Sequence, residues 1–77
     1  ISNDESPFEH VSDRELQTAL MVIDGLRVAE IAESFNVSPK TVNTYRYRIF
    51  EKLSIKSDME LAMLAVRYGL TSAGQAD

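Results

Sequence analysis

The most informative stretch of this sequence begins with a serine followed by a proline, Ser38-Pro39, and it limits the folds that the chain can adopt. Serine is a favourable N-cap, and proline fits the first helical position because the missing N–H has no partner there. At 100° per residue, the apolar side chains of the following run fall on one stripe. These side chains are Val42, Tyr45, Ile49 and Leu53. The sequence therefore predicts a helix over residues 39–53 with a core-facing side.

The opposite side of this predicted helix is polar and basic. It carries Lys40, Asn43, Thr44 and Tyr47, with Glu51 at the far end. Arg46, Arg48 and Lys52 flank it. Amide, hydroxyl and phenol groups beside basic side chains are the chemistry that contacts base edges and phosphates in DNA. The pattern indicates a DNA recognition helix.

The distribution of charge supports this interpretation, although the 77-residue chain has a net charge of −4. Residues 36–56 carry five basic side chains and one acidic, a net charge of +4. Residues 1–35 carry two basic and eight acidic (−6), and residues 57–77 carry one basic and three acidic (−2). Charge that is separated into blocks along the sequence in this way indicates one cationic surface on an acidic body. Non-specific binding to DNA should then be weak and strongly dependent on salt.

Two helices are predicted ahead of this segment. Ser12 and Glu15 have the spacing of a capping box, so a helix begins at Asp13, and Gly25 ends it. A second helix covers residues 28–35, and Asn36, which tolerates positive φ, supplies the turn that follows. A short helix, a turn and a longer helix form a helix-turn-helix in an all-α fold.

A fourth helix is predicted to start at a second capping box, Ser57 to Glu60, and to end at Gly69. Its apolar set is broader than one core stripe needs, which leaves part of it for a partner. We expect residues 1–10 to be a linker or arm in which Phe8 tucks against the body, residues 11–70 to be the domain, and residues 71–77 to be a flexible tail.

Enzymatic and metal-binding functions find little support. The chain has no Cys, its one His is His10 in the predicted arm, and no cluster has the spacing of metal ligands. We therefore expect no catalytic residue, metal or cofactor. A membrane span and a signal peptide are also not predicted, which favours a soluble module. A cytoplasmic location is expected from the DNA-binding function that the recognition helix indicates. Because the chain begins at Ile1, we expect it to be a piece of a longer protein.

Residues 12–70 resemble the LuxR-type (NarL/FixJ or GerE-type) DNA-binding domain of bacterial response regulators. The resemblance lies in Val11-Ser12-Asp13-Arg14-Glu15, Gly25, Glu30-Ile31-Ala32, Val37-Ser38-Pro39-Lys40-Thr41-Val42 and Ile49-Phe50-Glu51-Lys52-Leu53. The run 38–48 looks most like the GacA/UvrY branch of that family. Two departures are Val28-Ala29, where polar or basic residues are common, and Tyr45, where many members have His.

The resemblance implies a four-helix LuxR-type domain in which the third helix enters the major groove of double-stranded DNA and the fourth forms a homodimer. Asn43, Thr44 and Tyr47 match base-contacting positions. Thr41 matches a phosphate-contacting threonine, and Lys52 matches a basic residue near the end of the helix. With the other basic residues of this helix, the expected phosphate contacts are Lys40, Thr41, Arg46, Arg48 and Lys52. The expected dimer contacts are Met59, Met63, Leu64 and Arg67. Glu15 looks like the family's buried glutamate, with a structural role.

The same resemblance implies an upstream receiver domain that a sensor kinase phosphorylates. Two alternatives stay open at this point. One is a helical protein-interaction module that does not contact DNA and uses the cationic or the fourth helix on an acidic partner. The other is a domain like region four of a sigma factor, which also contains a helix-turn-helix but works within RNA polymerase.

Overall fold

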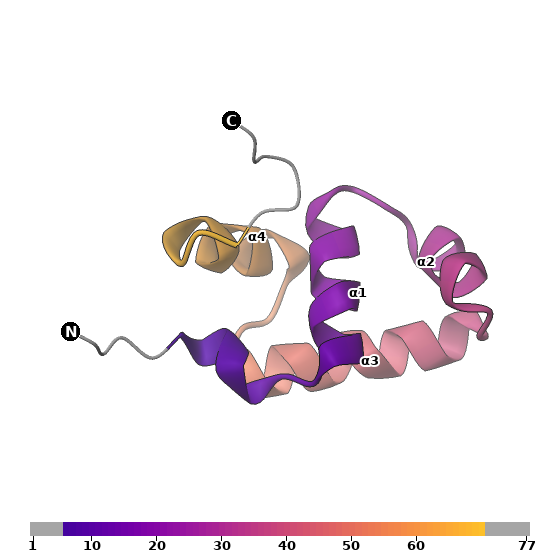
Figure 1. Ribbon diagram of the computed structural model, residues 1–77, viewed down its shortest axis with the longest axis horizontal. Coiled ribbons are helices and arrows are strands. Elements are labelled where there is room, and N and C mark those ends of the chain that lie inside the picture. The colour runs from indigo at the N-terminus through magenta and orange to yellow at the C-terminus, as the bar shows by residue number, and fades with distance from the viewer. Residues whose placement is uncertain (1–5, 71–77) are drawn as a thin grey trace.

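The computed structural model describes residues 6–70 of the chain, and within them it contains only helices. A short 3-10 helix, η1 (Pro7–His10), is followed by α1 (Asp13–Ile23), α2 (Val28–Phe35), α3 (Pro39–Leu53) and α4 (Asp58–Arg67) (Figure 1). The predicted all-α, four-helix architecture is therefore confirmed. None of these helices has the length and apolar character needed to cross a membrane.

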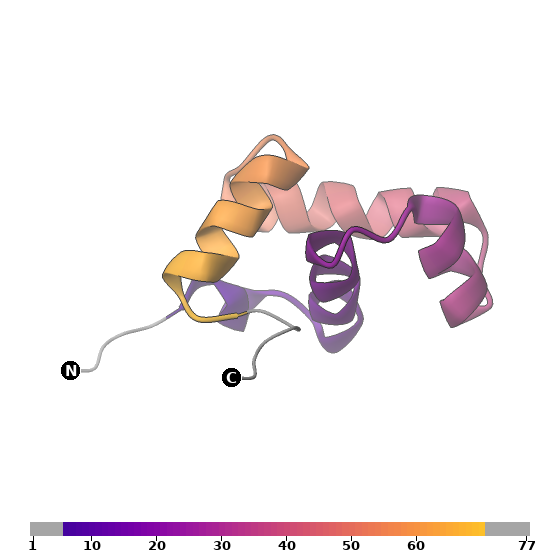
Figure 2. The ribbon, with the colours of Figure 1, turned by 90° about the horizontal axis from the view of Figure 1, so that it is seen from above.

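The longest helix, α3, is the element on which the others are arranged. α1 packs across it, α2 packs against its first half, and η1 also contacts it. Figure 2 shows α2 and α4 at opposite ends of α3. α4 reaches the rest of the fold mainly through α1. This arrangement leaves one long side of α3 without a neighbouring helix in residues 6–70.

The buried side chains form two clusters, and α3 contributes to both. The larger cluster consists of Phe8, Ala19, Ile49, Leu53, Leu61 and Ala65. The smaller one consists of Ile31, Ala32 and Val42. Val22 of α1 packs against both clusters. The second half of α3 thus rests on the larger core and its first half on the smaller one.

Local capping sets the starts of the helices. At α1 both halves of the predicted box are present: the Ser12 hydroxyl accepts from the Glu15 N–H (3.1 Å), and the Glu15 carboxylate accepts from the Ser12 N–H (2.9 Å). At α3 the Ser38 hydroxyl accepts from the Thr41 N–H (3.2 Å), and Pro39 is the first helical residue, as predicted. Asn36 has φ 61° and ends α2 in the expected left-handed conformation.

The second predicted capping box, at α4, is only half formed. The Ser57 hydroxyl accepts from the Glu60 N–H (3.1 Å), but the Glu60 carboxylate accepts from the Lys56 N–H (3.0 Å) rather than from that of Ser57. The backbone of Ser57 is more extended (φ −152°) than that of Ser12 (φ −73°), and this turns its N–H away. The prediction of a reciprocal box at α4 was wrong, although the helix begins where expected.

Part of the predicted arm belongs to the folded body. Residues 7–10 form η1, whose Phe8 is 6% exposed and meets the ring of Tyr68 edge-to-face with centroids 6.5 Å apart. The expectation that Phe8 packs against the body is confirmed. The predicted arm, residues 1–10, therefore includes four residues that fold against the domain. Residues 1–5 of that arm and the predicted tail 71–77 lie outside the described residues.

Candidate nucleic-acid interface

The core-facing side of α3 is formed by the residues that the sequence predicts. Val42 and Ile49 are fully buried and Leu53 is 8% exposed. Tyr45 is half-buried, and its ring lies edge-to-face on that of Phe35 with centroids 6.5 Å apart. These contacts fix the rotation of α3 about its own axis, and so they determine which side chains face outward.

The outward side of α3 is polar and largely without internal partners. Lys40, Thr44, Tyr47, Arg48 and Glu51 are exposed, and Asn43 is half-buried at its edge. Tyr47 is 65% exposed, which is high for a large aromatic side chain. An exposed phenol beside amide, hydroxyl and cationic groups suits a polar ligand better than a core contact.

The three predicted base-reading side chains lie together on this side, and two of them make local hydrogen bonds. The Asn43 Oδ1 accepts from Nη1 of Arg46 (3.1 Å), which leaves its amide N–H groups for a ligand. The Thr44 hydroxyl donates to the carbonyl of Lys40 (3.1 Å), which leaves its oxygen as an acceptor and its methyl group for apolar contact. Tyr47 adds a phenol that can donate or accept.

The predicted phosphate-contacting residues fall into two groups. Lys40 and Arg48 are exposed and make no side-chain hydrogen bond or ion pair within residues 6–70. Thr41 is half-buried, with its hydroxyl oxygen 3.1 Å from that of Ser38 at the start of the helix. These three side chains lie in the first three turns of α3.

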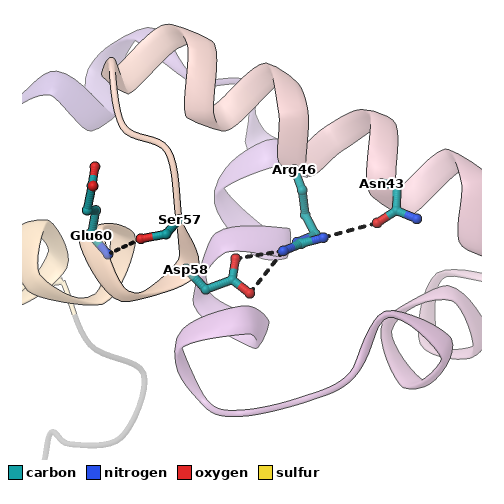
Figure 3. Close-up of polar contacts among 5 residues, drawn as sticks. All are labelled: Asn43, Arg46, Ser57, Asp58 and Glu60. Atoms are coloured by element: carbon teal, nitrogen blue, oxygen red, sulfur yellow. Dashed lines mark hydrogen bonds and ion pairs between the residues drawn. The ribbon is translucent and has the colours of Figure 1, made fainter.

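The charges of Arg46 and Lys52, in contrast, are paired within the domain. Arg46 donates from Nη2 to both carboxylate oxygens of Asp58 (2.8 and 2.9 Å), as Figure 3 shows. Lys52 Nζ lies 2.7 Å from Oε1 of Glu15. The partners are 12 and 37 residues apart in sequence, and no spacing rule predicts such pairs. Neither cation is as available to a phosphate as the sequence suggests.

Glu15 is nearly inaccessible, at 3% exposure. Burial alone would raise the pKa of the Glu15 carboxyl, but hydrogen bonds from Lys52 and from the Ser12 N–H, with the Lys52 charge, together hold this pKa below its usual value. Glu15 thus ties the start of α1 to the end of α3, which agrees with the structural role expected from the sequence.

The N-terminus of α3 differs electrostatically from those of the other α-helices in residues 6–70. Acidic residues lie in the first turns of α1, α2 and α4, whereas α3 has none there and carries Lys40 instead. The positive end of the helix dipole is therefore not neutralised locally. Such an end, together with a lysine, favours the approach of an anion such as a DNA phosphate.

A second exposed surface is apolar and lies on α4. Met59, Met63 and Val66 are 73%, 65% and 69% exposed. Leu64, predicted at the dimer interface, is half-buried and packs on the larger core cluster, so it faces the surface only in part. Arg67 is exposed beside it, and both line a shallow hollow with Ile55, Glu60 and Met63. Val66 was not among the predicted dimer contacts, because most residues of α4 are apolar and the sequence does not show which of them face outward.

Residues 6–70 contain no group of three or more His, Cys, Asp or Glu side chains placed to hold a metal ion. His10 is exposed at the end of η1.

Comparisons with known proteins show which family this chain is similar to. Residues 9–65 match the family described as bacterial regulatory proteins, luxR family. Response regulator GacA of Pseudomonas viridiflava is 60% identical over 68 residues, 88% of this chain and 32% of the relative. GacA of Pseudomonas aeruginosa is 59% identical and UvrY of Escherichia coli K12 58%, each over 69 residues, 90% of this chain and 32% of the relative. The chain thus spans about a third of the length of these relatives.

Proposed function

This chain belongs to the luxR family of bacterial regulatory proteins, and we propose that it reads a specific DNA sequence by placing α3 in the major groove. Family membership, together with relatives that are response regulators, identifies a DNA-binding domain that regulates transcription. An α-helix fits the width of the major groove, where each base pair presents a distinct pattern of donors and acceptors.

One observation carries this proposal: the outward side of α3. Its exposed polar side chains lack partners in other helices of the described chain, while Val42 and Ile49 on the reverse side are fully buried. Asn43, Thr44 and Tyr47 would contact base edges. Lys40, Thr41 and Arg48 would contact phosphates and fix the register of the helix on the duplex.

We further propose that two copies bind together through α4. The exposed Met59, Met63 and Val66 form an apolar surface, and Arg67 lies beside them. A symmetric dimer would place two α3 helices on paired half-sites about one helical turn, or about 10 base pairs, apart. The isolated domain need not be dimeric, because DNA itself brings the copies together.

The whole protein, by analogy with relatives about three times as long, would be a cytoplasmic response regulator. Its upstream receiver domain would be phosphorylated by a sensor kinase and would control the pairing of these DNA-binding domains. The family match over residues 9–65 favours this function over a sigma-factor-like module.

Selection from a random DNA pool tests the proposal. We expect enrichment of a site with two half-sites, and fluorescence anisotropy should give tighter binding to it than to a scrambled duplex at low and at moderate salt. Binding that is equal on both duplexes, with no enriched sequence, would favour the alternative of a protein-interaction module.

A further inference from the structure

Arg46 joins a residue proposed to read DNA to the start of α4. Its Nη1 donates to Oδ1 of Asn43 (3.1 Å), and its Nη2 donates to both carboxylate oxygens of Asp58, the first residue of α4. Figure 3 shows Arg46 lying between the two side chains, with its guanidinium directed toward both. The three residues form a chain of contacts from α3 to α4.

The Arg46 side chain is held more firmly than an ordinary surface arginine. It is 21% exposed, and its guanidinium carbon lies 5.5 Å from the centre of the Phe50 ring. Contacts to a carboxylate, an amide and an aromatic ring leave a planar guanidinium little freedom to turn toward a phosphate. Its positive charge is also balanced by Asp58.

The orientation of the Asn43 amide follows from the chemistry of arginine. A guanidinium has only donors, so it can bond only the oxygen of the amide, and the NH₂ group must point elsewhere. An asparagine that reads adenine with two bonds uses its oxygen as well as its nitrogen. With the oxygen engaged by Arg46, Asn43 offers mainly donors to the groove.

We propose that Arg46 is a positioning residue, which Asp58 holds in place and which presents the Asn43 amide to DNA as a hydrogen-bond donor. Asn43 then favours base edges that carry acceptors, such as purine N7, guanine O6 or thymine O4. This inference rests on the proposed function of α3, and it replaces the expected phosphate contact of Arg46. It also makes base reading depend on where α4 begins.

The chain offers a matched pair of variants for a test. Asp58→Ala removes the carboxylate that holds Arg46, and Glu60→Ala removes a carboxylate from the same first turn of α4, where Glu60 bonds the Lys56 N–H and not Arg46. Both variants lose one negative charge, so any general electrostatic gain in DNA affinity is shared. Thermal unfolding of both variants checks that each is folded.

The measurement is the dissociation constant for four duplexes that differ only at the base pair read by Asn43. That pair is the one at which Asn43→Ala abolishes discrimination. Asp58→Ala should reduce the wild-type preference there by about 5- to 10-fold, a part of the discrimination that one well-placed side chain supplies. Preferences at other positions should stay unchanged, as should all preferences of Glu60→Ala. In the Asn43→Ala background, Asp58→Ala should have no further effect on these ratios.

A second readout needs no DNA. In the free wild-type domain and in Glu60→Ala, ¹⁵N relaxation of the Asn43 side-chain amide should report a restrained group, and in Asp58→Ala a mobile one. The proposed function stands if the wild type selects a site and Asn43→Ala loses discrimination at one base pair. The positioning role of Arg46 is overturned if Asp58→Ala nevertheless keeps that discrimination and its Asn43 amide stays restrained. A wild-type domain that selects no sequence overturns both.

Discussion

Replacing Lys52 by Met tests the contact that ties the end of α3 to the start of α1. Methionine keeps much of the aliphatic stem of lysine but removes the ammonium group that lies 2.7 Å from Glu15. The Glu15 carboxylate, 3% exposed, then retains the Ser12 N–H as its hydrogen-bond donor but has no positive partner. Lys52→Met should therefore destabilise the domain through an uncompensated buried charge.

The size of the effect follows from the exposure of the two partners. Removing one member of a fully buried pair costs about 3 to 5 kcal/mol. Because the Lys52 side chain is 38% exposed, solvent screens the pair, and we expect a loss of about 2 kcal/mol. For a domain of this size, that corresponds to a fall in Tm of about 8 to 16 °C.

The pH dependence identifies the cause of the loss. In the wild type, the pKa of Glu15 is lowered in the folded state, so its contribution to stability is present above the ordinary pKa of a glutamate and is lost as pH falls through the lower folded value. In Lys52→Met the hydrogen bond and the charge of Lys52 are both lost while burial remains, so the pKa of Glu15 should be higher than in the wild type. The two proteins should therefore differ most at neutral pH and converge in acid.

Urea unfolding followed by circular dichroism at pH 7, 5 and 4 measures this difference, with Lys56→Met as the charge-matched control in the loop after α3. Glu15→Gln in the Lys52→Met background should recover part of the loss, since a neutral amide can still accept the Ser12 N–H. A loss below about 0.5 kcal/mol, the size of ordinary surface changes, at every pH would refute the reasoning.

Three further predictions concern DNA. Asn43→Ala should weaken binding to the selected site by about 1 to 3 kcal/mol and leave binding to random DNA nearly unchanged, as anisotropy titrations on both duplexes would show; equal losses would remove Asn43 from base reading. Arg48→Ala should weaken binding to all sequences alike and reduce the slope of log K against log salt by about 1, whereas Lys56→Ala, outside α3, should change the slope less. Met63→Asp should abolish cooperative binding to paired half-sites, although the variant should stay folded and still bind a single half-site. Intact cooperativity in gel shifts would exclude the α4 surface as the dimer contact.

The helix boundaries were predictable because local chemistry sets them. Ser12 with Glu15, and Ser38 with Pro39, satisfy or remove free amide groups within one turn, so the sequence determines where α1 and α3 begin. The buried stripe of α3 was also predictable, because apolar residues that recur with the period of an α-helix lie on one side of it. The outward position of the candidate base-reading residues then follows, because they occupy the opposite side of the same helix.

Contacts between helices were not predictable in this way. The Glu15–Lys52 and Arg46–Asp58 pairs depend on how α3 packs against α1 and on where α4 starts, which no local spacing encodes. Arg46 and Lys52 therefore resembled free cations in the sequence. On α4, nearly every position is apolar, so the sequence could not distinguish the half-buried Leu64 from the exposed Val66.

The division of the core into two clusters along α3 has a consequence for the cooperativity of the fold. The first half of α3, which carries Asn43 and Thr44, is backed by the smaller cluster, which includes Ile31 of α2. Amide hydrogen exchange should be faster in α2 than in α1, because opening this end exposes less apolar surface. DNA bound at α3 would suppress that opening and add a negative heat-capacity change to binding. Affinity for DNA would then depend on the packing of α2, even where no α2 side chain touches a base.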